Sequence, residues 1–129
     1  MSSKECKLKT MFDMRLDFIK EMKETIKGSY PEFPLDISQK DSQQVCRDLV
    51  LKGVEEMFEA LQHLKNWKPH RQTDLSSEVM DKDEFLEEII DAFNYFFAML
   101  IVTGFDENDL FDAFLMKHKK INDRLRDGY

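Results

Sequence analysis

Hydrophobic positions recur at helical spacing in four stretches of the chain, and polar segments separate these stretches. From about Cys6 to Lys27, apolar residues such as Phe12 and Ile19 return mostly every three or four positions, which is the period of an amphipathic helix. The same periodicity predicts three further helices, over about 38–69, about 81–103 and about 107–126. Four helices with short connections favour an all-α, antiparallel four-helix bundle.

Residues that start or stop helices flank each stretch. A pair of residues with capping-box spacing, Asp41 and Gln44, is an expected start of the second helix. The other expected caps and breakers are Gly28 after the first helix, Ser38 as an earlier start of the second, Trp67-Lys68-Pro69 at its end, Asp81 or Asp83 before the third, Gly104 after it, and Asp106 with Asp109 before the fourth.

The third helix begins acidic and becomes apolar on nearly every side between Ile89 and Val102. A helix that is apolar all round must be buried by other helices. Asp91 and Asn94 lie inside this apolar run, so we expect Asp91 to be buried. A buried carboxylate is costly unless it is paired, hydrogen-bonded or bound to a metal. A divalent cation is the expected partner of Asp91 and of Glu88, one turn earlier.

Two carboxylate pairs have the spacing of residues that share a helix face. Glu56 and Glu59 are three positions apart on the second helix, and Glu88 and Asp91 are three apart on the third. On antiparallel neighbouring helices the two pairs could converge and offer oxygen ligands to Mg²⁺, which also favours phosphate oxygens. The alternative is a pair of solvated helix faces in a chain with 26 acidic residues. Three other acidic residues are assigned to such faces: Glu55, Glu84 and Glu87.

Basic and aromatic residues suggest how a nucleotide could be held. Cations after the first carboxylate pair and near the end of the fourth helix could bind a polyphosphate, or could instead complement helix dipoles. These cations are Lys65, Lys68, Arg71, Lys117 and Arg124. Trp67, the single tryptophan, could stack on a base or simply pack. The three histidines, His63, His70 and His118, show no ligand spacing with the carboxylates.

Composition narrows the classes of function. A chain of 129 residues is expected to form one domain over 1–129. The net charge of −7 argues against a nucleic acid polymer as partner. No apolar run is long enough for a bilayer span or a signal peptide, and Cys6 and Cys46 form no disulfide framework. We therefore expect a soluble cytoplasmic protein with no membrane partner.

These residues together resemble the all-α nucleoside triphosphate pyrophosphatases, which include dimeric dUTPases, phage dCTPase/dUTPases and MazG-like enzymes. The signature of that superfamily, Glu-x-x-Glu followed by Glu-x-x-Asp on the next helix, is matched by Glu56–Glu59 and Glu88–Asp91. The dimeric dUTPase branch is further resembled at Met11–Met14, Asn66–Lys68, Asp91–Phe96, and Lys117 through Arg124 to Tyr129. Two positions depart from its pattern. Ile121 stands at an Asn position with Asn122 after it, and Arg15 stands where a Gln is usual.

The resemblance implies a homodimer that uses Mg²⁺ to hydrolyse a deoxynucleoside triphosphate, with dUTP favoured, to the monophosphate and pyrophosphate. It implies metal ligation by Glu56, Glu59, Glu88 and Asp91, with Glu56 or Glu59 also accepting a proton. It implies phosphate binding by Lys68, Lys117, Arg124 and Tyr129, and nucleoside contacts from Trp67, Asn94, Asn122 and Arg15. The alternatives are a dCTP, purine or non-canonical nucleotide substrate, or a non-catalytic helical bundle that binds a partner through its Phe-rich face.

Overall fold

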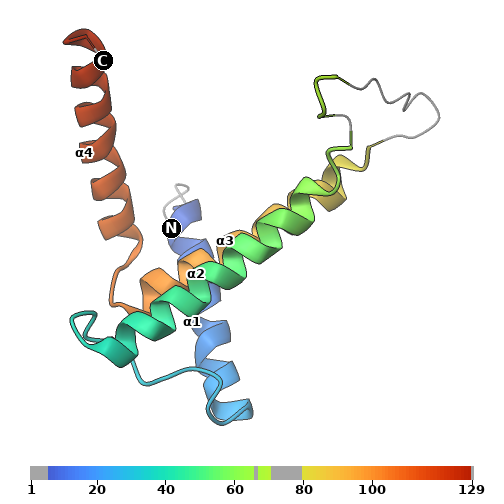
Figure 1. Cartoon of the computed structure of the whole chain (residues 1–129). Helices are drawn as coiled ribbons and strands as arrows, with labels where there is room; N and C mark the ends of the chain where they lie inside the picture. Colours follow the sequence, from blue (N-terminus) through green and yellow to red (C-terminus); the bar gives the residue numbers. More distant parts are fainter. Residues whose placement is uncertain (1–5, 66, 71–79, 129) are drawn as a thin grey trace. The chain divides into compact units, whose positions relative to one another are not determined.

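The computed structural model describes residues 6–65, 67–70 and 80–128, and these ranges contain four α-helices and no strand (Figure 1). The helices are α1 Lys7–Thr25, α2 Lys40–Leu61, α3 Lys82–Val102 and α4 Glu107–Arg126. The all-α class expected from the sequence is confirmed. Among the described residues, none of the helices is long and apolar enough to cross a membrane.

The chain divides into two compact units. One comprises Met1–Leu35 with Leu100–Tyr129 and holds α1 and α4, which contact each other. The other comprises Asp36–Met99 and holds α2 with nearly all of α3. We call the second unit the α2–α3 pair. The assignment of residues 1–129 to a single domain stays a prediction.

In the α2–α3 pair the two helices lie side by side and run in opposite directions (Figure 1). Gly53 of α2 faces Phe96 of α3. Ten residues after Gly53, just past the end of α2, the ring of His63 meets that of Phe85, with centroids 6.2 Å apart. A Cβ at Gly53 would stand 2.5 Å from a ring carbon of Phe96. Real Cβ atoms do not approach so closely, so glycine at this position sets how near the helices come.

Local capping accounts for the ends of α3 and α4. Asp81 accepts a hydrogen bond from the backbone N–H of Glu84 and caps α3. Gly104 follows α3 with a φ of +91°, a backbone conformation that glycine adopts without strain. Asp106 and Asp109 form a reciprocal capping box at α4, each carboxylate accepting from the other residue's backbone N–H at 2.9 Å. The predicted caps of these two helices are confirmed.

Helix α2 begins at Lys40, close to the earlier of its two predicted starts, whereas the later predicted start and the predicted end are wrong. The N-cap is Gln39, which makes no side-chain capping bond, so the expected capping box at Asp41 does not form and Asp41 lies in the first turn. The helix ends at Leu61 and not near Trp67. After Leu61 the backbone N–H groups bond to carbonyls three residues back, as His63 does to Ala60. This tighter turn interrupts the α-helix although the apolar spacing continues to Leu64.

Burial of α3 also differs from the prediction of a helix covered on all sides. Its fully buried side chains include Ala92 and Ala98, whereas Leu86, Ile90 and Phe93 are exposed. Asp91 is exposed as well, so the prediction of a buried Asp91 is wrong. The reason is physical: an apolar run predicts burial only where another surface covers it, and within the α2–α3 pair the described part of α2 does not cover this side of α3.

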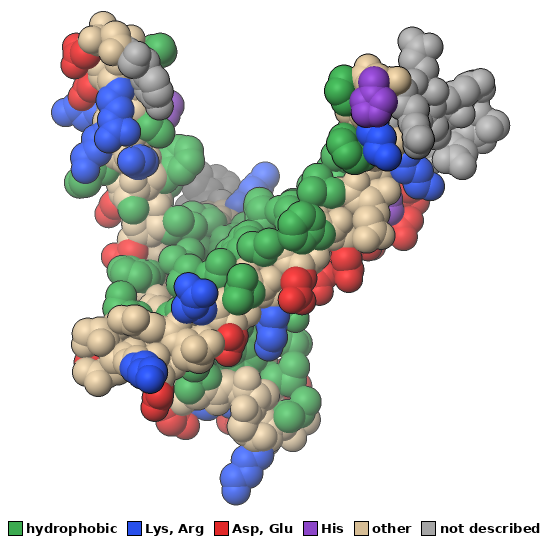
Figure 2. Space-filling model, in the orientation of Figure 1, with side chains coloured by type: hydrophobic (Ala, Val, Ile, Leu, Met, Phe, Trp, Pro, Cys, Tyr) green, Lys and Arg blue, Asp and Glu red, His purple; other side chains and the backbone are tan. Residues whose placement is uncertain are grey.

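Large apolar side chains are exposed in both units. On α4 no residue is buried, and its exposed apolar side chains are Phe111, Phe114, Leu115, Met116, Ile121 and Leu125. Figure 2 shows hydrophobic side chains gathered along one edge of the α2–α3 pair and acidic side chains in a row along the other. Contiguous exposed apolar surface of this kind marks an interaction surface.

Candidate metal site on the α2–α3 pair

The antiparallel register of α2 and α3 brings three of the four predicted carboxylates together. Glu56, Glu59 and Glu88 each offer an oxygen, and these oxygens all lie within 4.8 Å of one another. Glu56 and Glu88 are half-buried, and Glu59 is exposed. Glu56 and Glu59 meet because they are one turn apart on α2, and Glu88 reaches them from α3. We call these three residues the carboxylate group.

Asp91 is the fourth predicted ligand and lies beside this group. Asp91 is exposed. Its carboxylate is not one of the three whose oxygens lie within 4.8 Å of one another. Its negative charge nevertheless raises the pKa of Glu56. The site therefore has a compact core of three carboxylates and a fourth charge within electrostatic reach of Glu56.

The electrostatics of the group appear in the pKa of Glu56, which is raised above its ordinary value. Partial removal from water is the largest cause, followed by repulsion from Glu59 and Asp91, a hydrogen bond shared with Glu59, and repulsion from Glu88. Like charges held close together disfavour ionisation. A bound cation would relieve this repulsion, so the charge distribution fits a divalent ion.

A cavity of about 380 Å³ opens next to the carboxylate group. Its walls are formed by Glu59, Gln62, His63, Lys65 and Glu88. Two of the clustered carboxylates therefore line the same cavity as an amide, an imidazole and an ammonium group. Lys65, which the sequence suggested as a phosphate-binding cation, supplies positive charge to this wall.

Other predicted residues of this unit lie near the end of α2 and on α3. Trp67 is 69% exposed, and the ammonium of Lys68 lies 5.6 Å from the centroid of its indole ring. Asn94 is half-buried on α3, one turn after Asp91. Arg71 lies outside the described residues.

The remaining predicted residues belong to the other unit, and their roles stay predictions. Lys117 and Arg124 are exposed on α4. The side-chain amide of Asn122 lies 3.2 Å from Nε2 of His118. On α1, the guanidinium of Arg15 lies 4.3 Å from the centroid of the Phe18 ring. Tyr129 falls outside the described residues.

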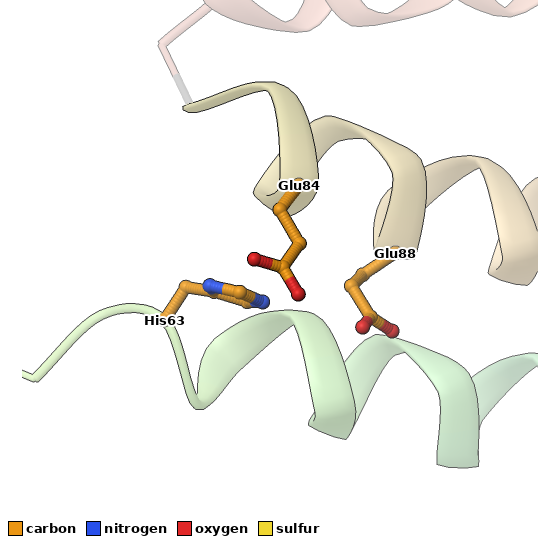
Figure 3. A group of neighbouring side chains, drawn as sticks. All are labelled: His63, Glu84 and Glu88. Carbon is orange, nitrogen blue, oxygen red and sulfur yellow. The ribbon is translucent and has the colours of Figure 1, made fainter. Parts of the chain in front are cut away.

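A second group, not predicted from the sequence, is made by His63, Glu84 and Glu88. One ligand atom from each lies within 4.8 Å of the other two (Figure 3). Glu84 was assigned to a solvated face, and it is exposed. His63 was expected to lack ligand spacing with the carboxylates, and that expectation is wrong. The sequence did contain a spacing signal for this group. His63 stands seven positions after Glu56, and Glu84 stands seven positions before Asp91. On antiparallel helices these residues lie two turns along from the predicted pairs.

No family model, curated protein or solved structure matches this chain.

Proposed function

We propose that this protein is a Mg²⁺-dependent hydrolase that cleaves a deoxynucleoside triphosphate, with dUTP the favoured substrate, to the monophosphate and pyrophosphate. The proposal is supported above all by the convergence of Glu56, Glu59 and Glu88 from two antiparallel helices. This is the arrangement that the resemblance to all-α nucleoside triphosphate pyrophosphatases leads one to expect.

The carboxylate group suits Mg²⁺ in its chemistry. Mg²⁺ prefers oxygen ligands, is held by few carboxylates, and keeps coordination positions for water and phosphate. Three carboxylates within 4.8 Å of one another and the nearby charge of Asp91 supply such ligands. The cavity beside Glu59 and Glu88 provides room for a phosphate chain.

Each residue then has a distinct task. Mg²⁺, when bound, neutralises phosphate charge and lowers the pKa of the attacking water. Glu56, Glu59, Glu88 and Asp91 would hold the metal. A carboxylate of the Glu56–Glu59 pair also accepts the proton of the attacking water, as a general base positioned beside the metal.

The other predicted residues bind the rest of the nucleotide in this proposal. Lys68, Lys117 and Arg124 contact the phosphates, because ammonium and guanidinium groups form charge-assisted hydrogen bonds with phosphate oxygens. Tyr129 closes over the phosphates, as the resemblance implies. Trp67 offers an exposed ring for stacking on the base. Asn94, Asn122 and Arg15 contact the nucleoside.

The proposed assembly is a homodimer that covers apolar side chains exposed in the single chain. Phe93 on α3 and Phe114 on α4 are 41% and 65% exposed. Replacing Phe114 by Ser is expected to weaken self-association, measured by sedimentation over a concentration series. A compact monomer at the highest concentration of the unmodified chain would contradict the dimer.

The test of the activity is release of pyrophosphate and monophosphate from a panel of canonical and modified nucleoside triphosphates, with Mg²⁺ and with EDTA. Metal-dependent turnover that is strongest on dUTP is the expected result. Turnover on dCTP, a purine or a non-canonical nucleotide would keep the mechanism and replace the substrate.

One observation favours a second candidate, a non-catalytic helical bundle that binds a partner protein. Apolar side chains are exposed along all four helices of the described chain, among them Met14, Phe58, Leu86 and Phe114. Absence of turnover on every nucleotide of the panel would leave this candidate in place of the hydrolase.

A further inference from the structure

We propose that His63, Glu84 and Glu88 form a second cation site, which takes a first-row transition metal ion such as Zn²⁺. The site differs from the carboxylate group in containing a nitrogen ligand. The inference stands on the geometry of these three side chains and does not require that the protein hydrolyse a nucleotide.

The three side chains converge on one point from both helices of the pair. Glu84 and Glu88 lie on successive turns of α3 and point toward α2, while His63 comes from the turn that ends α2 (Figure 3). Glu84 lies between His63 and Glu88. One nitrogen and two carboxylate oxygens all lie within 4.8 Å of one another, close enough for these side chains to hold one metal ion after small rotations.

Direct bonding among the three side chains does not explain their convergence. No hydrogen bond or ion pair links His63, Glu84 and Glu88 to one another, and all three are described residues. The ring of His63 is oriented instead by its edge-on contact with Phe85. The imidazole thus faces the two carboxylates without being bonded to them.

Ligand chemistry points to a transition metal. Mg²⁺ binds oxygen ligands and enters nitrogen sites reluctantly, whereas imidazole suits Zn²⁺ and neighbouring first-row ions. Three protein ligands with a further position left for water or substrate is the pattern of open zinc sites. The cavity beside His63 and Glu88 leaves space for that further ligand.

Glu88 belongs to both groups. A carboxylate has two oxygens and can therefore contact two cations. The carboxylate group and the His63 group thus form neighbouring sites that share one residue. Loss of Glu88 is expected to weaken both, whereas loss of Glu56 or His63 should weaken only one.

The experiment is calorimetric titration of Zn²⁺ into the full chain without a histidine tag, in excess Mg²⁺ and without nucleotide. We expect about one Zn²⁺ to bind per chain. His63→Gln and Glu84→Gln should each weaken binding by about tenfold or more, since even loss of a ligand's supporting partner commonly costs that much. His70→Gln and Glu87→Gln are matched controls, since both residues are exposed and outside the group, and should bind as the unmodified chain does.

A second readout reports direct ligation. The chain has three histidines, so their imidazole resonances can be resolved by NMR, and Zn²⁺ should shift the resonance of His63. Unchanged Zn²⁺ affinity in both His63→Gln and Glu84→Gln, or an unshifted His63 resonance at saturating Zn²⁺, would overturn the proposal. Glu56→Gln separates it from the proposed activity, because this variant should lose turnover and retain Zn²⁺. A chain that binds Zn²⁺ but hydrolyses no nucleotide would count against the proposed activity alone.

Discussion

Helix α4 carries a complete capping box and no buried side chain, whereas α2 has no side-chain cap and buries Leu49, Gly53 and Ala60. The start of α4 is defined by its own sequence, through Asp106 and Asp109. Helix α2 owes its position to packing against α3, most closely at Gly53. Both groups of candidate metal ligands lie on the pair that depends on packing, because their convergence requires side chains from two helices.

The candidate metal ligands and the exposed apolar stripe of α4 thus lie on different helices. The α2–α3 pair brings Glu56, Glu88 and His63 together within one chain. Helix α4 instead exposes a stripe that includes Phe114 and Leu125 and gains burial only from another surface. Four substitutions test this division, and they follow in order of expected effect.

The largest effect is expected at Asp91. Asp91→Ala should lower Mg²⁺-dependent turnover by about 100-fold or more, because it removes a proposed ligand. Its helical circular dichroism should not change, since the exposed side chain leaves no cavity behind. Glu87→Ala, at an exposed position of the same helix, is the control and should retain full turnover. An Asp91→Ala variant that is as active as the unmodified chain would show that the metal site is misassigned.

The next effect tests whether close packing sets the geometry of the pair. Gly53→Ala gains about 1 kcal/mol of helix propensity but drives a methyl group into the Phe96 ring, and such overpacking costs about 1–3 kcal/mol. We expect net destabilisation in urea unfolding. In a Phe96→Leu background the same Gly53→Ala change should become stabilising, because the ring is gone. Equal effects in both backgrounds would show that the two residues are not coupled.

A smaller effect is expected at the cap of α4. Asp106→Ala should lower the free energy of unfolding by about 1 kcal/mol, the usual worth of such a cap. Gln39→Ala at the start of α2 should stay within about 0.5 kcal/mol, because Gln39 makes no side-chain capping bond. If both changes cost the same, the contrast between a locally capped helix and a packed helix would fail.

The smallest effect concerns the charge of the carboxylate group. The pKa of Glu56 is raised in the folded chain, so the folded state binds more protons than the unfolded state just above the ordinary pKa. Metal-free stability therefore falls as pH rises through that window, and the loss persists at neutral pH. Glu56→Gln removes this penalty and should be stabilising at about pH 7 but not at about pH 4.

The gain is expected to be about 0.3 kcal/mol, the size of a like-charge repulsion on a helix surface. It is measured by urea unfolding in EDTA. Glu55→Gln, at the neighbouring exposed position, is the control and should show no such pH dependence. A gain of equal size at both pH values would mean that the repulsion within the group is not its source.

Sequence alone predicted the four helices and the caps of α3 and α4 correctly, but not the capping box or the end of α2. The period of apolar residues located all four helices, and the spacing of Asp106 and Asp109 identified the capping box of α4, since a cap depends only on nearby residues. The end of α2 was placed too far along because Leu64 keeps the helical spacing after the hydrogen bonding has changed at Leu61.

The candidate site was predictable in part. Pairs such as Glu56 and Glu59 share a face of one helix, and that spacing can be read directly. Which residues of α3 stand opposite α2 depends on register, which Gly53 and Phe96 set through contact across the pair. For this reason His63 was missed. Asp91 was wrongly taken as buried because periodicity shows an apolar surface but not whether anything covers it.

The chain carries its own optical reporter at the end of α2. Trp67 is the single tryptophan and is 69% exposed, with Lys68 over its ring. Its fluorescence should therefore begin at the long emission wavelength of an indole in water. A base stacked on the ring would quench this emission and shift it to shorter wavelength, whereas a cation alone offers no ring to stack on the indole. Unlabelled protein can thus report nucleotide binding optically and distinguish it from the binding of a cation alone.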